Sequence, residues 1–220
     1  MFKTGFQAGY DLGYEIGKKR GFHPFNGTSI ILPTCLPDEN AITTIRKIEA
    51  LTPHPYELIV ANAGSSEVTM QYLRKRVGAV RHIAAGNGEN IVGVLNKAVF
   101  AAHGQTLAVL IGVSPNIDQW LADLIAELER DSSMRTIYVR SAPCIHNAGA
   151  HLTSLSGDED VRFQLNVCCL LFRKGLISDI GLWDENLGTL GESVSEWLSR
   201  IPKQNKSMVE ASDRFIRPKH

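Results

Sequence analysis

The chain has 220 residues, a length that suits one domain, and its 44% hydrophobic and 21% charged residues are the balance of a globular protein. Lysine plus arginine equals aspartate plus glutamate at 23 each, so the formal net charge is zero. Nucleic-acid-binding domains usually carry a basic excess, and we therefore expect no nucleic-acid partner. No apolar run reaches about 18 residues, so no transmembrane segment is expected either.

The four cysteines are Cys35, Cys144, Cys168 and Cys169. They form no C-x-x-C pair, so neither a disulfide framework nor a zinc site is indicated. Cys168 and Cys169 lie in an apolar run, which is typical of core packing. The N-terminus lacks the apolar stretch of a secretory signal. These features favour a reducing compartment, and we expect a cytoplasmic protein.

Residues 1–26 differ from the rest of the chain. Glycine recurs there at every fourth position, and aromatic residues follow the glycines in step. Residues four apart share one face of a helix, so a glycine stripe would let another backbone approach closely. Each glycine costs a helix about 1 kcal/mol relative to alanine, so no stable helix is expected for this segment alone. Two interpretations stay open: a mobile tail, or an element for docking to a protein partner or for self-association.

From residue 28 onward, segments with strand and helix patterns alternate. Short apolar runs bounded by turn residues predict strands at 29–33, 57–61, 80–84, 106–111 and 135–139. Apolar residues at helical spacing predict helices at 39–51 and 117–129, with Asp38 as the N-cap of the first. A helix at about 67–77 is expected after the turn cluster at 62–66, and another runs from its cap Asn90 to about Ala102. This alternation implies βαβ crossovers and a mostly parallel sheet covered by helices. The predicted fold class is α/β, in one domain over residues 27–220.

The pattern loosens after about residue 141. Residues 141–157 are rich in loop formers, 166–172 predict a buried strand, 181–185 a turn and 192–200 a short helix. The tail from residue 202 is polar and basic. In parallel α/β sheets, ligands bind beyond the carboxyl ends of the strands. The loops expected to matter are therefore those after Leu32, Ala61, Ala84 and Leu110.

Five short motifs follow one another between residues 28 and 200. They are S-I-I-L-P-T at 29–34, E-L-I-V-A-N-A-G-S-S at 57–66, Asn87 with Asn96 and A-A-H-G at 101–104, G-L-W-D-E at 181–185, and G-E-S at 191–193 with Arg200. In this order and spacing they resemble the motifs of the family-2 glycosyltransferases. The resemblance implies the GT-A fold, an open, mostly parallel sheet flanked by helices, and a nucleotide-sugar or glycan as the small-molecule ligand. The ligand-binding positions that it implies are Pro33, Thr34, Asn62, Gly64, Asn87, Asn96, Ile111, Gly112 and Val113.

The departures from the family pattern fall on the positions that carry its chemistry. The family's two aspartates after the second strand, which help to hold the nucleotide base, correspond to Asn62 and Ala63. The family's arginine before the helix asparagine corresponds to Leu95. The family's D-x-D at the end of the fourth strand corresponds to Ile-Gly-Val at 111–113.

These departures argue against metal-dependent sugar transfer. A divalent metal would stabilise the negative charge that grows on the diphosphate leaving group, but Mg²⁺ and Mn²⁺ prefer oxygen ligands, and Ile111 and Val113 have none in their side chains. We therefore assign no metal ligand and expect neither Mn nor Mg as a cofactor. The family's base aspartate corresponds to Ser193, so Glu192 is the remaining candidate for a catalytic base, and whether the chain is an enzyme stays open.

Other groups could supply the positive charge that a metal would bring to the diphosphate. A cationic side chain can replace a metal, and the candidates are Arg81, Lys97 and Arg173. A shifted alignment at the fourth strand would bring in Asp118, which also reads as an ordinary acid in the first turn of a helix. The histidines lack the spacing of a metal site: His146, His151 and His220.

Four of the binding candidates have a structural interpretation as well. Asn62 either hydrogen-bonds a base edge or is a plain turn residue. Residues 86–88 either precede a helix N-terminus that binds phosphate or form a plain turn. Asn96 either contacts the ligand or holds the structure together. Glu192 is either a base or a solvated acid at the start of a helix.

The leading hypothesis is a glycosyltransferase-like protein that binds a nucleotide-sugar or sugar, with impaired or absent metal-dependent transfer. One alternative is an active, metal-independent glycosyltransferase. Another is a non-catalytic scaffold or assembly protein that joins a complex through residues 1–26.

Overall fold

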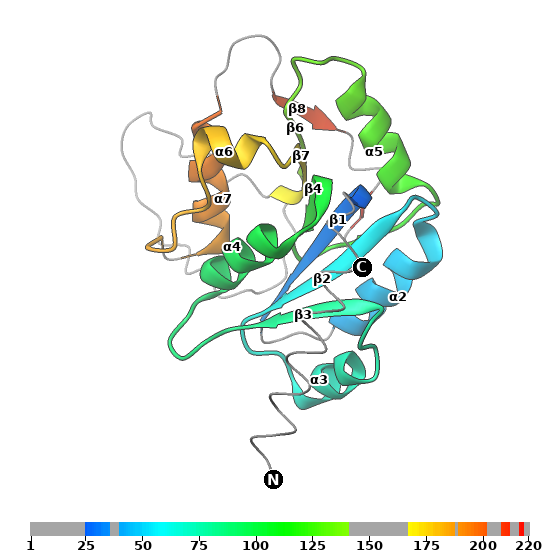
Figure 1. Cartoon of the computed structure of the whole chain (residues 1–220), viewed down its shortest axis with the longest axis vertical. Helices are drawn as coiled ribbons and strands as arrows, with labels where there is room; N and C mark the ends of the chain where they lie inside the picture. Colours follow the sequence, from blue (N-terminus) through cyan, green and yellow to red (C-terminus); the bar gives the residue numbers. More distant parts are fainter. Residues whose placement is uncertain are drawn as a thin grey trace, which may run out of the picture.

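The computed structural model describes residues 25–35, 40–140, 167–187, 189–201, 208–211 and 216–217 (Figure 1). Its main sheet consists of β1 (Phe25–Thr34), β2 (Tyr56–Asn62), β3 (Val80–Ala84), β4 (Gly104–Leu110), β6 (Thr136–Arg140), β7 (Val167–Arg173) and β8 (Met208–Ala211). These strands lie in the order β3-β2-β1-β4-β7-β6-β8. A second, small sheet pairs β5 (Ser114–Pro115) with β9 (Ile216–Arg217).

Helices cover both faces of the main sheet. One face carries α2 (Ala41–Leu51), α3 (Glu67–Arg74) and α5 (Trp120–Glu129), and the other carries α4 (Ile91–Ala101), α6 (Leu176–Ile180) and α7 (Leu190–Ser199), as Figure 1 shows. Successive side chains of a strand face opposite sides, so a strand buried on both faces is apolar throughout. Ile30 belongs to the core under α2 and α5 and Ile31 to the core under α4 and α7, and both are fully buried. The predicted α/β class is confirmed.

The sheet is mostly parallel, with one antiparallel insertion. β1 pairs in parallel with β2 and β4, and β2 pairs in parallel with β3. β7 runs antiparallel to both β4 and β6, and β6 pairs in parallel with β8. The strand predicted at 135–139, which is β6, therefore does not lie beside β4. The strand predicted at 166–172, which is β7, lies between β4 and β6.

The helix bounds differ from the predicted ones where the backbone turns early. The helix expected at 67–77 ends at Arg74, and the chain then turns through Gly78, whose φ of +95° suits glycine. The helix expected to begin at residue 117 begins at Trp120, because Gln119 takes a left-handed φ of 62°. Asn90 is confirmed as an N-cap, since its Oδ1 accepts a hydrogen bond of 3.0 Å from the Gly93 N–H.

Several expectations fall on parts of the chain outside the described residues. These are the proposed cap Asp38, the histidines His146, His151 and His220, and residues 1–24 of the N-terminal segment. The predicted boundary after residue 26 stays a prediction, although β1 already begins at Phe25. α6 and the short strands β5, β8 and β9 were not predicted. None of the helices among the described residues is long and apolar enough to cross a membrane.

Candidate functional site

The carboxyl ends of the parallel strands meet at one edge of the sheet. In register, Thr34 at the end of β1 lies beside Asn62 at the end of β2, and Asn62 lies beside Ala84 at the end of β3. Ile31 pairs with Val109, so the end of β4 reaches the same edge. The topology therefore gathers the loops that the sequence singled out, and we call this region the carboxyl edge.

Thr34 ties the turn after β2 to β1. Its side chain is buried, with its Oγ1 2.9 Å from the Ser65 Oγ, and its carbonyl oxygen accepts a hydrogen bond of 2.8 Å from the Ala63 N–H. Pro33, which precedes it, is half-buried. Gly64 is exposed and has a φ of +116°, a conformation that few residues other than glycine adopt. The turn after β2 is thus held in its conformation by contacts within the protein.

The side-chain amide of Asn62 makes its contacts within the protein. Its Oδ1 accepts hydrogen bonds from the Gly64 N–H at 2.9 Å and the Ser65 N–H at 2.7 Å, the geometry of an Asx turn. Its Nδ2 lies 2.9 Å from the Met70 Sδ and 3.1 Å from the His82 Nε2. Asn62 is buried, and this geometry matches the turn interpretation of the residue rather than contact with a base edge.

The end of β4 offers a metal no side-chain oxygen. The Ile111 N–H donates to the Cys168 carbonyl at 2.8 Å, the exposed Gly112 has a φ of +66°, and Val113 is buried in the core beneath α5. Because Mg²⁺ and Mn²⁺ need several oxygen ligands, these three residues do not fit such an ion. Among the described residues, no group of three or more His, Cys, Asp or Glu side chains is placed to hold a metal ion.

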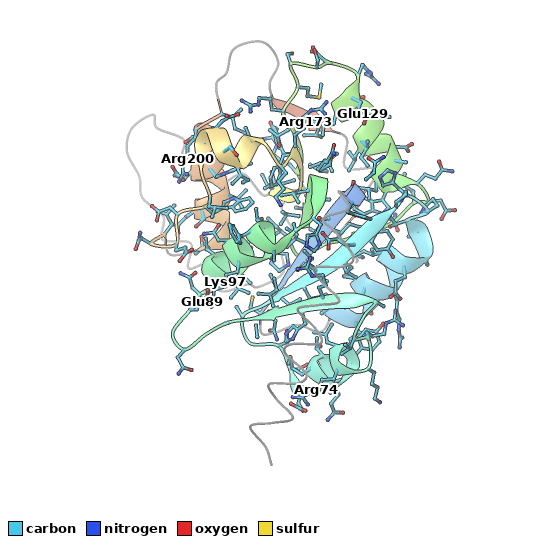
Figure 2. All side chains as sticks on the ribbon, in the orientation of Figure 1. Arg74, Glu89, Lys97, Glu129, Arg173 and Arg200 are labelled. Carbon is cyan, nitrogen blue, oxygen red and sulfur yellow. The ribbon has the colours of Figure 1, made fainter. Side chains whose placement is uncertain are left out.

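The turn before α4 is already occupied by a carboxylate. The Oε2 of Glu89 accepts hydrogen bonds of 2.7 Å from the Gly86 N–H and 2.7 Å from the Lys97 Nζ, and the two side chains lie together at the start of α4 in Figure 2. The hydrogen bond from the Gly86 backbone, and then that from Lys97, lower the pKa of Glu89 below its usual value. Asn87 is exposed. This geometry matches the plain-turn interpretation of residues 86–88.

Asn96 fastens the G-L-W-D-E loop to α4. Its Nδ2 donates to the Trp183 carbonyl at 2.9 Å and to the Glu185 Oε1 at 2.8 Å, and its Oδ1 accepts from the Trp183 N–H at 3.2 Å. Asn90 adds a hydrogen bond of 2.8 Å to the Glu185 carbonyl. Asn96 is 5% exposed and serves as a clamp between segments nearly 90 residues apart in sequence.

Glu192 caps the helix that it begins. Its Oε2 accepts hydrogen bonds from the Thr189 N–H at 2.9 Å and the Thr189 Oγ1 at 3.1 Å, and its own N–H donates to that Oγ1 at 3.1 Å, which is a capping box. Ser193, in the position of the family's base, is fully buried, with its Oγ 3.0 Å from the Asp184 carbonyl. The geometry matches the interpretation of Glu192 as an acid at the start of a helix.

Two of the cationic candidates lie away from the carboxyl edge. Arg81 is the second residue of β3 and pairs with Glu57 at 2.8 Å, at the amino ends of the strands. Burial raises the pKa of Glu57, but hydrogen bonds from Ser29, the His103 backbone and Arg81 lower it more, so the pKa lies below its usual value. Arg173 pairs in register with Thr106, near the start of β4. Lys97 is engaged by Glu89, and Asp118 is exposed ahead of α5.

His82 is a residue of this region that the sequence did not point to. It lies on β3 opposite Val60, on the same face of the sheet as Asn62, and contacts the Asn62 amide. Its position follows from the strand period of two combined with the parallel register of β2 and β3. The register depends on which strands are neighbours, which a single sequence does not reveal.

Comparison with known proteins shows the fold. No family model matches the chain, and no curated protein matches it in sequence. TarS of S. aureus is similar in structure at a TM-score of 0.62 and 15% identity, over 87% of this chain and 60% of that one. A mannosyltransferase from Pyrobaculum calidifontis, solved with GDP-Man and Mn²⁺, is similar at a TM-score of 0.65 and 15% identity, over 97% of this chain and 66% of that one.

A third similar structure is glucosyl-3-phosphoglycerate synthase from Mycobacterium tuberculosis, solved with Mn²⁺, UDP and phosphoglyceric acid. Its TM-score is 0.59 at 12% identity, over 85% of this chain and 68% of that one. The chain spans less than two thirds of the length of the first two of these proteins. The resemblance to the GT-A glycosyltransferases is confirmed at the level of the fold.

Proposed function

We propose that the chain binds a nucleotide-sugar at the carboxyl edge and transfers its sugar poorly or not at all by a metal-dependent route. The support is the GT-A fold, together with a carboxyl edge where the ends of β1, β2 and β4 meet. The similar mannosyltransferase was solved with GDP-Man and Mn²⁺ bound, and the similar synthase with UDP and Mn²⁺. A nucleoside diphospho-sugar is therefore the ligand class to test first.

The observation that carries the proposal is the chemistry at the end of β4. Ile111 and Val113 stand where the resemblance places a pair of metal-binding aspartates, and Val113 is buried in the core. A leaving diphosphate gains negative charge in the transition state, and apolar side chains cannot stabilise it. The charge that grows in the transition state adds to the charge of the bound diphosphate, so the missing metal ligands weaken transfer more than they weaken donor binding.

The acceptor side supports the same conclusion. A general base must lie within hydrogen-bond reach of the acceptor hydroxyl and be free to take its proton. Glu192 instead accepts two hydrogen bonds from Thr189 through one carboxylate oxygen, and the neighbouring Ser193 is buried against backbone carbonyls. We propose that Glu192 has a capping role, and we assign no catalytic base.

Thermal unfolding of the purified chain tests the proposal. The panel contains UDP-, GDP- and dTDP-sugars, each with Mn²⁺ and with EDTA. Ligand at about 100 times its dissociation constant adds about 2.7 kcal/mol of stability. For a chain of this length, that corresponds to a rise in Tm of roughly 5–10 °C. We expect a rise with one nucleotide class, equal in Mn²⁺ and EDTA.

A pair of variants locates the bound ligand. Thr34→Val removes the contact between the Thr34 and Ser65 hydroxyls at the carboxyl edge, while Thr136→Val removes a buried hydrogen bond of 3.1 Å to the Leu171 carbonyl near the opposite edge. Both lower the Tm of the free protein, because each deletes one buried hydroxyl contact. Only Thr34→Val should reduce the rise in Tm caused by the ligand. An equal reduction in both variants would place the ligand elsewhere, and no rise with any donor would refute the proposal.

A further inference from the structure

His82 and Asn62 form a contact whose hydrogen-bond direction is fixed by the backbone. The Gly64 and Ser65 N–H groups can only donate, so the Asn62 atom that faces them is the oxygen. The Asn62 atom that faces His82 is therefore the amide nitrogen, which also can only donate. The His82 Nε2, 3.1 Å away, must accept. An imidazolium has hydrogens on both nitrogens and cannot accept, so the contact requires a neutral ring with its proton on Nδ1.

The charged groups around His82 also oppose its protonation. His82 is exposed on β3, and partial desolvation of its ring, and then the Arg74 guanidinium on α3, lower the pKa of His82 below its usual value. Arg74 is itself paired with Glu67 at 3.0 Å. On β2 the neighbouring polar group is the neutral Asn62, and α4, on the other face of β3, carries Lys97, paired with Glu89 at 2.7 Å. The carboxylates of Glu67 and Glu89 are paired with Arg74 and Lys97 rather than with the imidazole.

Protonation of His82 breaks the first of a series of contacts that leads from His82 through Asn62 to the carboxyl edge. His82 is exposed, so the imidazolium turns away to solvent, and the Asn62 Nδ2 loses this acceptor and keeps only its contact with the Met70 Sδ at 2.9 Å. Asn62 holds the Gly64 and Ser65 amides, and Ser65 in turn contacts the Thr34 hydroxyl at 2.9 Å. Asn62 is thus one of the residues that hold the turn from Ala63 to Ser66, beside the carbonyl and hydroxyl of Thr34.

We propose that His82 is a positioning residue that couples pH to ligand binding: its neutral ring helps to hold Asn62 and the turn after β2 in the form that accepts a nucleotide-sugar, and its protonation weakens that hold. The part about the ligand rests on the function proposed above, whereas the contact itself does not. The sign follows from the linkage. The interaction is complete above the ordinary histidine pKa of about 6.5 and is lost as the pH falls through the lower pKa of the folded state.

NMR of the free, full-length protein tests the contact without any ligand. The His82 ring protons and the Gly64 and Ser65 amide protons are followed from about pH 8 to about pH 5, the range in which histidines titrate. We expect the two amides to shift with the same midpoint as the His82 ring. A His82 ring that titrates while both amides stay unchanged would overturn the proposal.

Calorimetric titration with UDP-glucose and GDP-mannose over the same pH range tests the consequence for the ligand. Loss of about one hydrogen bond of positioning corresponds to a three- to tenfold weaker Kd at the acid end. If the amides co-titrate but neither donor binds at any pH, the proposed function fails while the contact stands, and the role assigned to His82 in ligand binding is overturned. A Kd that is independent of pH would overturn that role as well.

Three variants separate this role from a merely structural one. His82→Gln keeps an acceptor that does not titrate, so the Gly64 and Ser65 shifts and the Kd should lose their dependence on pH. Asn62→Asp keeps acceptors for both amides but places a carboxylate beside the ring, so the pKa of His82 should rise above its usual value. His54→Gln, on the loop before β2, is the matched control and should leave both pH profiles unchanged. A pH-dependent Kd that persists in His82→Gln would assign the effect to another group.

Discussion

Asn96 makes the strongest single prediction for stability. It makes three hydrogen bonds to Trp183 and Glu185, and only 5% of it is exposed. Asn96→Ala removes all three and leaves the backbone N–H and C=O of Trp183 without these partners in a buried region. Because a buried polar group without a partner costs about 1–3 kcal/mol, the loss is larger than that of a surface hydrogen bond.

The expected loss is about 2–4 kcal/mol, on the basis of three hydrogen bonds worth roughly 0.5–1.5 kcal/mol each. In a chain of this length, each kcal/mol shifts Tm by about 2–4 °C, so Tm should fall by roughly 5–15 °C. Asn96→Asp should be at least as damaging at neutral pH. Its carboxylate still accepts from the Trp183 N–H but cannot donate to the Trp183 carbonyl, and it places a second negative charge beside Glu185.

Urea unfolding followed by tryptophan fluorescence measures these losses. Asn87→Ala is the control, since Asn87 is exposed in the turn before α4, and surface changes of this kind stay within about 0.5 kcal/mol. Asp at position 96 should recover part of its stability as the pH is lowered, because a protonated carboxyl can again donate. An Asn96→Ala variant as stable as Asn87→Ala would refute the clamp, as would an Asp variant indifferent to pH.

Three further predictions concern other parts of the molecule. Burial raises the pKa of Glu57, but its hydrogen-bond partners lower it more, so its stabilising contribution is present above about pH 4.3 and is lost as the pH falls through the lower folded pKa. Glu57→Gln should therefore be less stable than the wild type at pH 7, and urea unfolding at a series of pH values should show the gap closing in acid. Thr189→Ala should lower the free energy of unfolding by about 1 kcal/mol through loss of the capping box with Glu192, and Thr189→Ser should restore most of it. Burial raises the pKa of the Cys169 thiol well above its usual value, so peptide mapping after brief iodoacetamide treatment should find the exposed Cys35 alkylated before Cys169. Equal labelling of these two cysteines would contradict the packing of β7.

The sequence predicted the parallel half of the sheet because its signals are local. Apolar runs such as that of β1 and the cap at Asn90 depend on neighbours within a few residues, and the structure has both. The place of β7 between β4 and β6 was not predictable in this way. It depends on pairings such as Leu107 with Phe172, which join distant parts of the chain and leave no periodic trace.

The sequence predicted that the loops after the parallel strands gather at one edge of the sheet, but not the contacts made there. The resemblance pointed to Asn62, Asn96 and Glu192, and each proves to be engaged by the protein itself. Residue type alone does not reveal whether an amide or carboxylate faces a ligand or a backbone N–H, since both uses need the same atoms. The role inferred for His82 needed the register of β3 on β2 as well.

The central claim is that a nucleotide-sugar binds at the carboxyl edge without a metal at the end of β4. Isothermal titration of the wild-type chain with UDP-glucose and GDP-mannose, in EDTA and in Mn²⁺, tests it most directly. We expect one of these donors to bind with the same Kd in both buffers. Binding that appears only with Mn²⁺ would contradict the account, because Ile111 and Val113 supply no oxygen ligand for that ion.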